Sequence, residues 1–500
     1  MSRKKISKIL VANRGEIAVR VMRTCRELGI TAVAVYSDPD RHALHVRQAD
    51  EAWPLPGAAP RDTYLDQEKI LDAARKAGAE AIHPGYGFLS ENASFSRACR
   101  ERGIIFIGPG PESIEMMGEK TRARETMSRA KVPIVPGTQP LADKDEARAA
   151  AERIGYPILI KAAGGGGGKG MRKVERAAEL AGAFETCRRE AVSAFGDGRV
   201  YIEKFLREPH HIEFQILADG AGEAVHLFER ECSVQRRHQK IIEETPAPLM
   251  TEELREAMGE AAVKAARACG YLGAGTIEFL VDADRHFYFL EMNTRLQVEH
   301  PITEMITGVD LVAKQIEIAG GATLRGFVPE RRGHALECRI YAEDPWNGFM
   351  PSPGLVRRLA VPGGPGVRDD SGVYAGFTIP MEYDPLISKL VVWGEDRERA
   401  LARMRRALEE YQIIGIRTNI PYLRRILRHP DFEAGHYDTQ FIEKRQDDLL
   451  REDADGPEEA AYAAAAVLTW FADEHGPALS FTAQAPSSAW KLSGRPGDRE

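Results

Sequence analysis

An aromatic segment that runs without a break into a row of polar side chains constrains this chain most. It covers residues 287–300, with the sequence FYFLEMNTRLQVEH. Its aromatic and apolar half, residues 287–292, favours extended structure. A similar segment, residues 276–281, lies just before it, and the polar residues 282–285 between the two predict a turn. We therefore expect a β-hairpin followed directly by a polar loop.

The predicted hairpin gathers oxygen ligands on one face. It can bring Glu278 opposite Glu291, and because strand side chains alternate, Asn293 shares the face of Glu291. Two carboxylates and an amide oxygen are hard ligands that suit Mg²⁺ carrying nucleotide phosphates. A cation, an amide and a carboxylate follow at every second position, namely Arg295, Gln297 and Glu299. A solvated hairpin end is the alternative, but it would not need such ordering.

Size and composition narrow the class of protein. The 500 residues suggest about three domains, on a prior of roughly 100–200 residues each. A net charge of −7 argues against nucleic-acid binding. The six cysteines contain no CxxC pair, which predicts buried thiols in a reducing compartment. We expect no membrane span, and a strand that begins near Ile9 leaves no room for a targeting peptide, so a cytoplasmic location is predicted.

The first hundred residues indicate a parallel α/β domain. Residues 8–12 and 31–36 are apolar strands, and the amphipathic stretch up to Arg26 predicts a helix between them. The GxGxxG loop of dinucleotide-binding folds is missing. The loop 83–92 (HPGYGFLSEN) follows another strand, where open α/β sheets bind ligands. An ordinary tight turn is the alternative for that loop.

The next segment centres on a run of five glycines. Residues 111–130 predict one helix that contains Lys120, and residues 131–137 predict a hinge. The strand 156–161 then leads into residues 162–171 (AAGGGGGKGM). Unobstructed backbone N–H groups can wrap phosphate oxygens, and Lys161 and Lys169 add charge, so we expect a phosphate-binding lid. It is not a P-loop, because Gly170 follows the lysine, and a flexible linker is the alternative.

Further polar positions stand out beyond the glycine loop. The alternation in residues 211–217 puts His211, Glu213 and Gln215 on one face of a strand. The donor-rich residues 235–240 predict an anion site or a solvated face. Residues 251–269 and 308–319 predict helices.

The C-terminal part predicts a separate α/β domain. Its strands are expected at residues 335–344, 355–361 and 387–393, and its helices at 397–411 and 421–427. Arg339 lies within an apolar strand, and an unpaired buried charge is costly, so it needs a ligand or a carboxylate such as Glu337. From about residue 445 the chain becomes Ala-rich, with a helix expected at 458–472 and a loosely ordered end.

Several of these motifs, in this order, resemble biotin carboxylase, the ATP-grasp component of biotin-dependent carboxylases. The resemblance runs from about Ile6 to Lys444. It is carried by residues 13–18 (NRGEIA), 83–92, 161–171, 235–240 (QRRHQK) and 291–303. It implies an α/β fold with an N-terminal parallel α/β (pre-ATP-grasp) domain at 1–115, an ATP-grasp domain at 116–328 with a mobile glycine-rich lid at 131–204, a C-terminal α/β biotin carboxylase domain at 329–447, and a tail at 448–500.

The resemblance also implies a reaction and its cofactors. ATP, bicarbonate and biotin would give ADP, phosphate and N1′-carboxybiotin, with Mg²⁺ or Mn²⁺, in an acetyl-CoA or other acyl-CoA carboxylase. No Met-Lys-Met biotin-attachment sequence and no carboxyltransferase segment occur. Biotin is therefore expected on a separate biotin carboxyl carrier protein, and a carboxyltransferase subunit is expected to be a second partner. The final acceptor, an acyl-CoA or pyruvate, is not readable from the sequence, and a homodimer is expected from the resemblance alone.

Site residues are carried over by matching motif positions. The metal residues are Glu278, Glu291 and Asn293. The ATP residues are Lys120, Lys161, Gly166, Gly167, Gly168, Met171, Glu203, Lys204, Leu206, His211, Gln235, His238 and Leu280. The bicarbonate residues are Lys240, Arg295, Gln297 and Val298, the general base is Glu299, and the biotin residues are Tyr86 and Arg339.

Two other functions remain alternatives. Another ATP-grasp ligase would share the nucleotide machinery, but not the loop from Arg295 to Glu299 together with Arg339. A nucleotide-sensing module would predict broken catalytic positions, whereas every position that can be matched is filled.

Overall fold

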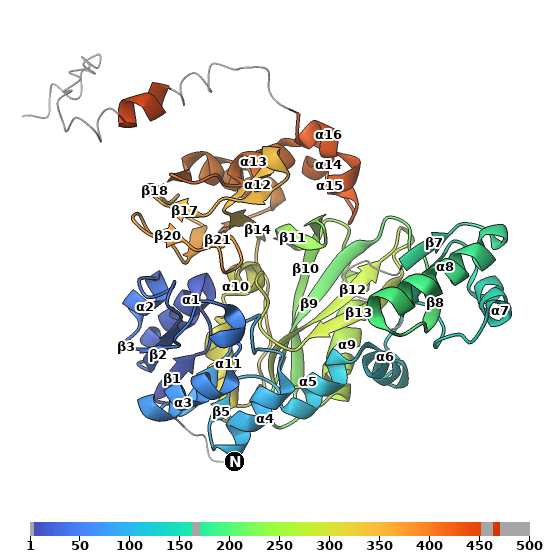
Figure 1. The fold of residues 1–500 in the computed structure, drawn as a ribbon, viewed down its shortest axis with the longest axis horizontal. Coiled ribbons are helices and arrows are strands. Elements are labelled where there is room, and N and C mark those ends of the chain that lie inside the picture. Colours follow the sequence, from blue (N-terminus) through green and yellow to red (C-terminus); the bar gives the residue numbers. More distant parts are fainter. Residues whose placement is uncertain (1–4, 163–170, 452–463, 471–500) are drawn as a thin grey trace, which may run out of the picture. The chain divides into compact units, whose positions relative to one another are not determined.

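The structure is a computed structural model that describes residues 5–162, 171–451 and 464–470 (Figure 1). The chain divides into two compact units, residues 1–449 and 450–500. In the second unit the described residues 464–470 are helical, within the range predicted for a helix. No helix in the described part of the chain is long and apolar enough to cross a membrane.

The N-terminal part is a five-stranded parallel sheet, as predicted. The strand order is β3-β2-β1-β4-β5. The strands are β1 Lys8–Val11, β2 Thr31–Tyr36, β3 Glu51–Pro54, β4 Ala81–His83 and β5 Ile105–Phe106. The helices are α1 Gly15–Glu27, α2 Leu44–Gln48, α3 Gln67–Ala77 and α4 Ala93–Glu101, with a 3₁₀ turn at Pro60–Asp62. The loops that follow β1 and β4 leave the same sheet edge, because neighbouring parallel strands end there.

A small antiparallel sheet forms the segment predicted as a lid. Its order is β7-β6-β8, from β6 Ile158–Ala162, β7 Met171–Val174 and β8 Val200–Lys204. The helices α7 Lys144–Ile154 and α8 Ala177–Phe195 supply apolar residues to its own core cluster. The predicted phosphate-binding residues Gly166, Gly167 and Gly168 lie outside the described residues.

An eight-stranded antiparallel sheet dominates the remaining structure, in the order β13-β12-β9-β10-β11-β14-β21-β19. Its strands are β9 His210–Ala218, β10 Ala224–Arg236, β11 Gln239–Thr245, β12 Gly273–Val281, β13 Phe287–Asn293, β14 His334–Tyr341, β19 Val367–Ser371 and β21 Leu386–Gly394. Because β14 pairs with β11, the strands predicted for a separate C-terminal domain continue the central sheet. The helices packed on it include α9 Glu252–Ala268, α10 His300–Thr307 and α11 Leu311–Ala319.

Short elements complete the C-terminal region. The strands are β15 Glu343–Asp344, β16 Met350–Pro351, β17 Gly354–Leu355, β18 Arg358–Ala360, β20 Thr378–Ile379 and β22 Gln412–Ile414, with a 3₁₀ turn at Pro345–Asn347. The helices are α12 Arg397–Glu410, α13 Ile420–Arg428, α14 Pro430–Glu433, α15 Phe441–Lys444 and α16 Gln446–Leu449.

Three predicted elements differ from the structure. The single helix at 111–130 is wrong: α5 Pro111–Gly118 and α6 Lys120–Arg129 are separated at Glu119, whose backbone is extended after a poor helix former, Gly118. The strand at 355–361 is two short strands that pair with different partners, β20 and β22. The helix expected from residue 308 begins at Leu311, because Asp310 caps it by accepting from the Ala313 N–H at 2.9 Å.

Candidate functional site

Two cavities meet at the polar loop that follows β13. The first, of about 480 Å³, is enclosed by α5, α6, the strands β6 and β8, and the β12–β13 hairpin. Its walls include eight predicted site residues: Lys120, Lys161, Glu203, Lys204, Leu206, Leu280, Glu291 and Asn293. The second, also about 480 Å³, is lined by four others: Tyr86, Arg295, Val298 and Arg339. Residues 293–298 therefore contribute to both cavities.

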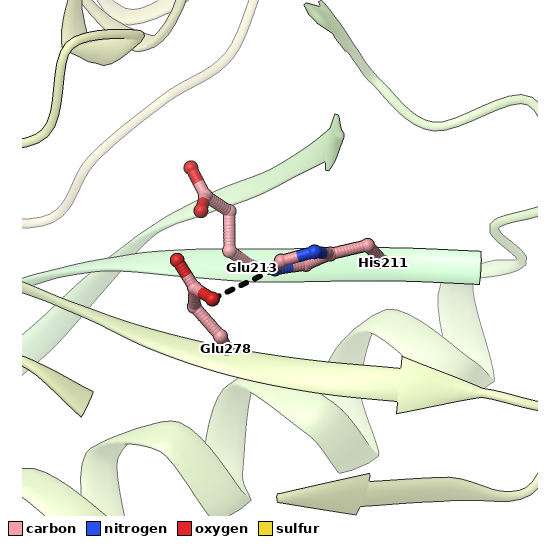
Figure 2. Close-up of side chains that lie close together, drawn as sticks. All are labelled: His211, Glu213 and Glu278. Carbon is pink, nitrogen blue, oxygen red and sulfur yellow. Dashed lines mark hydrogen bonds and ion pairs between the residues drawn. The ribbon is translucent and has the colours of Figure 1, made fainter. Parts of the chain in front are cut away.

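The hairpin has the predicted register. Glu278 lies directly opposite Glu291, and a β-bulge follows Glu278. One Glu278 oxygen accepts from Asn293 Nδ2 at 2.8 Å and from Gln297 Nε2 at 2.9 Å. Its other oxygen lies 2.8 Å from His211 Nε2. Figure 2 shows His211 and Glu213 on β9 and Glu278 on the neighbouring strand β12.

The residues of this hairpin suit a divalent cation. Glu278, Glu291 and Asn293 offer the hard oxygen donors that Mg²⁺ and Mn²⁺ bind. Donor atoms of His211, Glu213 and Glu278 also lie within 4.8 Å of one another, so Glu278 belongs to both candidate sets. Desolvation in the cavity and the charge of Glu278 raise the pKa of Glu291. A cation would remove the repulsion between the two carboxylates, which supports the carboxylate pair as metal ligands.

Lys240 forms ion pairs with three carboxylates beneath the cavities. Its Nζ lies 2.7 Å from Glu213, 3.1 Å from Glu278 and 2.6 Å from Glu299. Burial alone would lower the pKa of Lys240, but the surrounding anionic groups raise it well above its usual value. The ammonium group is therefore firmly charged.

Glu299 is fully buried between two cations. One oxygen lies 2.6 Å from Lys240 Nζ and the other 3.0 Å from Arg339 Nη2. Burial alone would raise the pKa of Glu299, but Lys240 and Arg339 hold it well below its usual range. Arg339 also lies 2.6 Å from Glu243, so its ion-pair partners are Glu243 and Glu299 and not Glu337, two positions earlier on the strand.

The nucleotide-side residues form a second charged group. Glu203 contacts Lys161 through one oxygen and accepts from Arg124 Nη1 at 2.6 Å through the other. Lys204 Nζ donates to the Gly155 carbonyl at 2.8 Å. Lys204 thus lines the cavity, while its ammonium group is hydrogen-bonded to the main chain.

Of the remaining predicted residues, one lies beside the site and two are exposed. Gln235 lies 2.8 Å from His211 Nδ1, which joins it to the Glu278 group. Met171 is exposed at the start of β7. His238 is exposed in the β10–β11 turn, with a left-handed φ of 66°, and the described part of the structure does not bring it to either cavity wall.

The polar loop is fixed from both sides. Arg295 donates to Gln297 at 2.9 Å and to Asn293 at 2.8 Å, and its Nε donates to Glu91 at 3.0 Å. The Val298 carbonyl accepts from Lys389 Nζ at 3.0 Å. Three of the four residues predicted for bicarbonate, Arg295, Gln297 and Val298, therefore lie in one loop, and the fourth, Lys240, contacts the same Glu278 oxygen as Gln297.

Sequence reasoning assigned no role to several residues around this site. Arg230 is fully buried, 2.5 Å from Glu213 and 2.7 Å from Gln215, and it fixes the carboxylate that Lys240 also contacts. The period-two alternation of β9 had placed Glu213 and Gln215 on the site's face, but no local pattern pointed to Arg230 or Lys389.

Three family models match the chain in succession. They are "Biotin carboxylase, N-terminal domain" over residues 5–114, "Carbamoyl-phosphate synthase L chain, ATP binding domain" over 119–327, and "Biotin carboxylase C-terminal domain" over 337–444. The described residues of all three segments contribute to the two cavities.

Individual proteins are similar over most of their length. A pyruvate carboxylase subunit of Methanothermobacter thermautotrophicus is 56% identical over 441 residues, which cover 88% of this chain and 90% of that protein. Biotin carboxylase of Nostoc is 54% identical over 443 residues, covering 88% and 99%. A solved structure of the Hydrogenobacter thermophilus 2-oxoglutarate carboxylase biotin carboxylase domain dimer, in complex with MgADP, ADP and bicarbonate, has a TM-score of 0.82 and 50% identity, covering 90% and 99%. The chain belongs to the biotin carboxylases, the ATP-dependent ligase subunits of biotin-dependent carboxylases.

Proposed function

We propose that this chain carboxylates N1′ of carrier-linked biotin with bicarbonate and ATP, through a carboxyphosphate intermediate. The observation that carries the proposal is the position of Glu299, whose two oxygens contact Lys240 and Arg339. Arg339 lines the second cavity, and Lys240 contacts Glu278 in the hairpin that encloses the first. A base between two cations, beside two cavities, suits a reaction that joins an anion to two larger substrates.

The first cavity is assigned to ATP. Lys120 and Lys161 supply positive charge for the phosphates. The residues beside Glu203 supply contacts for the purine. When bound between Glu278, Glu291 and Asn293, Mg²⁺ or Mn²⁺ supplies charge neutralisation for the phosphates. The hydrogenobacterial relative solved with MgADP supports this assignment.

Bicarbonate is assigned to the loop between the cavities. Arg295 and Lys240 would hold its charge, with Gln297 and Val298 orienting it. Glu299 is then the base that takes its proton, so that the bicarbonate oxygen can attack the γ-phosphorus and form carboxyphosphate with ADP leaving. The cations hold the pKa of Glu299 low in the structure; a bound anion would engage them and raise that pKa, which makes Glu299 a better base.

Biotin is assigned to the second cavity. Carboxyphosphate would break down to CO₂ and phosphate, and the phosphate would take the N1′ proton of biotin. Arg339 stabilises the enolate oxygen that results, and Tyr86 lies in the same wall. Because carboxyphosphate hydrolyses readily, closure of the lid over it would exclude water.

The partners and the setting are part of the same proposal. Biotin arrives on a separate carrier protein, and a carboxyltransferase subunit uses the product. The relative solved as a domain dimer supports a homodimer. A cytoplasmic location remains our prediction. An acyl-CoA acceptor also remains a prediction, because the relatives' names include pyruvate and 2-oxoglutarate carboxylases, so a 2-oxo acid is supported equally.

The test is ATP hydrolysis by the purified chain with and without bicarbonate, and with and without free biotin. Bicarbonate-dependent hydrolysis that biotin stimulates, with carboxybiotin formed, is the expected result. Hydrolysis that is indifferent to biotin would refute the proposed acceptor and favour another ATP-grasp ligase.

A further inference from the structure

Lys389 is a buried lysine that the proposed chemistry does not use. It lies on β21, directly opposite Arg339 of β14 and opposite Asp370 of β19. Its side chain is fully buried. An ammonium group loses strong hydration when it is buried, so such a position requires compensating contacts.

Its hydrogen bond, ion pair and ring contact lead to the loop and cavity wall assigned above, and its charge also acts on the buried Glu337 and Asp370. Nζ donates to the Val298 carbonyl at 3.0 Å and pairs with Glu16 at 3.1 Å. Glu16 in turn accepts a hydrogen bond from the Tyr86 hydroxyl. Nζ also lies 5.8 Å from the centre of the Tyr86 ring, within the range of a cation–π contact. One cation therefore connects β21, the first turn of α1, the loop after β4 and the polar loop after β13.

The two contacts of Lys389 serve different residues of the site. Val298 belongs to the group assigned to bicarbonate and also lines the cavity assigned to biotin, whereas Glu16 and Tyr86 line that cavity only. The Val298 contact acts on the backbone, so no change of the Val298 side chain could replace it. The Glu16 contact depends on a side-chain charge, which an amide of the same size removes.

We infer that Lys389 is a positioning residue that fixes the wall shared by bicarbonate and biotin, by holding the Val298 carbonyl directly and the Tyr86 hydroxyl through Glu16. This role rests on the proposed function. Lys389 touches neither reacting group in this arrangement, so it acts only through the residues that it holds. A purely structural role, in which Lys389 does no more than neutralise the buried Glu16, is the competing explanation.

A pair of variants separates the two explanations. In Lys389→Met the carboxylate of Glu16 loses its cation, and the fold itself is expected to suffer. In the double variant Lys389→Met with Glu16→Gln, both charges of the Lys389–Glu16 pair are removed together, so the fold is expected to be retained. Both are compared with the wild type by the KM for bicarbonate, free biotin and ATP in the hydrolysis assay.

The positioning role predicts a selective defect in the double variant. The KM for bicarbonate and for biotin should each rise at least about tenfold, as expected when a hydrogen bond from a charged group is lost, while the KM for ATP stays within about twofold. Wild-type KM values for bicarbonate and biotin in the double variant would overturn the inference, since neutralising Glu16 would then be the only role of Lys389.

The single variant Glu16→Gln tests the Glu16 contact alone, and it changes the side-chain volume very little. It should raise the KM for biotin while the KM for bicarbonate stays near the wild type, because the Lys389–Val298 contact remains. An equal rise in the KM for biotin and the KM for bicarbonate, or no rise in either, would show that the Glu16 and Val298 contacts do not act separately.

Arg255→Met is the matched control. It removes another buried cation, 2.8 Å from Glu229, at a position away from the walls of both cavities. It should lower stability without changing the KM for bicarbonate or biotin. Wild-type protein without bicarbonate-dependent, biotin-stimulated hydrolysis would overturn the proposed function itself, which keeps that failure distinct from the failure of Lys389's role.

Discussion

Glu299→Gln is the substitution that most directly tests the proposed chemistry. The amide keeps the size of the side chain but removes its charge and its basicity. In the wild type the two carboxylate oxygens face Lys240 at 2.6 Å and Arg339 at 3.0 Å. One end of a glutamine is an NH₂ donor, so one of the two cations would face a donor in place of an acceptor.

The size of the effect on kcat follows from the loss of the general base. General base catalysis contributes about 10²–10⁴-fold to rate, which corresponds to about 3–5 kcal/mol of barrier. We expect kcat for biotin-dependent ATP cleavage to fall by that factor. The KM for ATP should change less than about threefold, because the wall of the first cavity is built from other residues, including Lys120, Lys161 and Glu203.

The assay is the initial rate of bicarbonate-dependent ADP formation with free biotin, together with the carboxybiotin produced. Glu337→Gln is the matched control, since Glu337 is another buried glutamate on the central sheet. Burial raises the pKa of Glu337 well above its usual value, and neither of its oxygens has a hydrogen-bond partner among the described residues. Because Glu337 makes no hydrogen bond to the groups of the site among the described residues, its amide should have near wild-type kinetics. Near wild-type carboxylation by Glu299→Gln would refute the assignment of Glu299 as the base.

Three more predictions concern the metal, the nucleotide and acid stability. Glu278→Gln should raise the Mg²⁺ concentration needed for half-maximal hydrolysis at least about tenfold at fixed ATP; an unchanged requirement would exclude Glu278 as a ligand. Glu203→Gln removes the carboxylate that two cations share in the first cavity, so the KM for ATP should rise while that for bicarbonate does not, and the reverse pattern would reject the assignment. Burial alone would raise the pKa of Glu244, but hydrogen bonds from His334 and Arg397 lower it from 4.5 to about 2. The lowered pKa contributes about 3 kcal/mol of stability that is present above pH 4.5 and is lost as the pH falls toward 2. Urea unfolding at pH 5 and pH 3 should therefore show a smaller acid-induced loss for Glu244→Gln than for the wild type, and equal losses would contradict the pairing.

The hairpin at the site could be predicted because its causes are local. Alternation within two strands and the turn between them determine which side chains share a face, so the register of Glu278 with Glu291 followed from spacing alone. The same period put His211 and Glu213 on one face of β9, where Figure 2 shows them. The caps of α9 and α11 also follow from single residues, Thr251 and Asp310, although the start of α11 was expected too early.

The convergence of charge beneath the cavities could not be predicted, because its causes are not local. Lys240 on β11 meets Glu299 only because the sheet order places β9, β10 and β11 side by side and the loop after β13 returns over them. Sequence pattern left its donor-rich segment undecided between an anion site and a solvated face. Lys389 lies on a strand expected in a separate domain, and continuation of the central sheet through β14 and β21 brings it to the loop.

The buried charges under the loop also explain why stability alone does not account for this arrangement. The cations are Arg230, Lys240 and Arg339, and the carboxylates are Glu213, Glu243, Glu278 and Glu299. Burying ion pairs costs desolvation energy that their attraction repays only in good geometry, and apolar residues of similar size are often as stabilising or more so. Glu213 and Glu243 have raised pKa values, the latter about 7, whereas those of Glu278 and Glu299 are lowered. The neighbouring cations thus lower the pKa of Glu278 and Glu299 despite their burial, whereas burial raises the pKa of Glu213 and Glu243, a division that core packing does not require but that a catalytic site does.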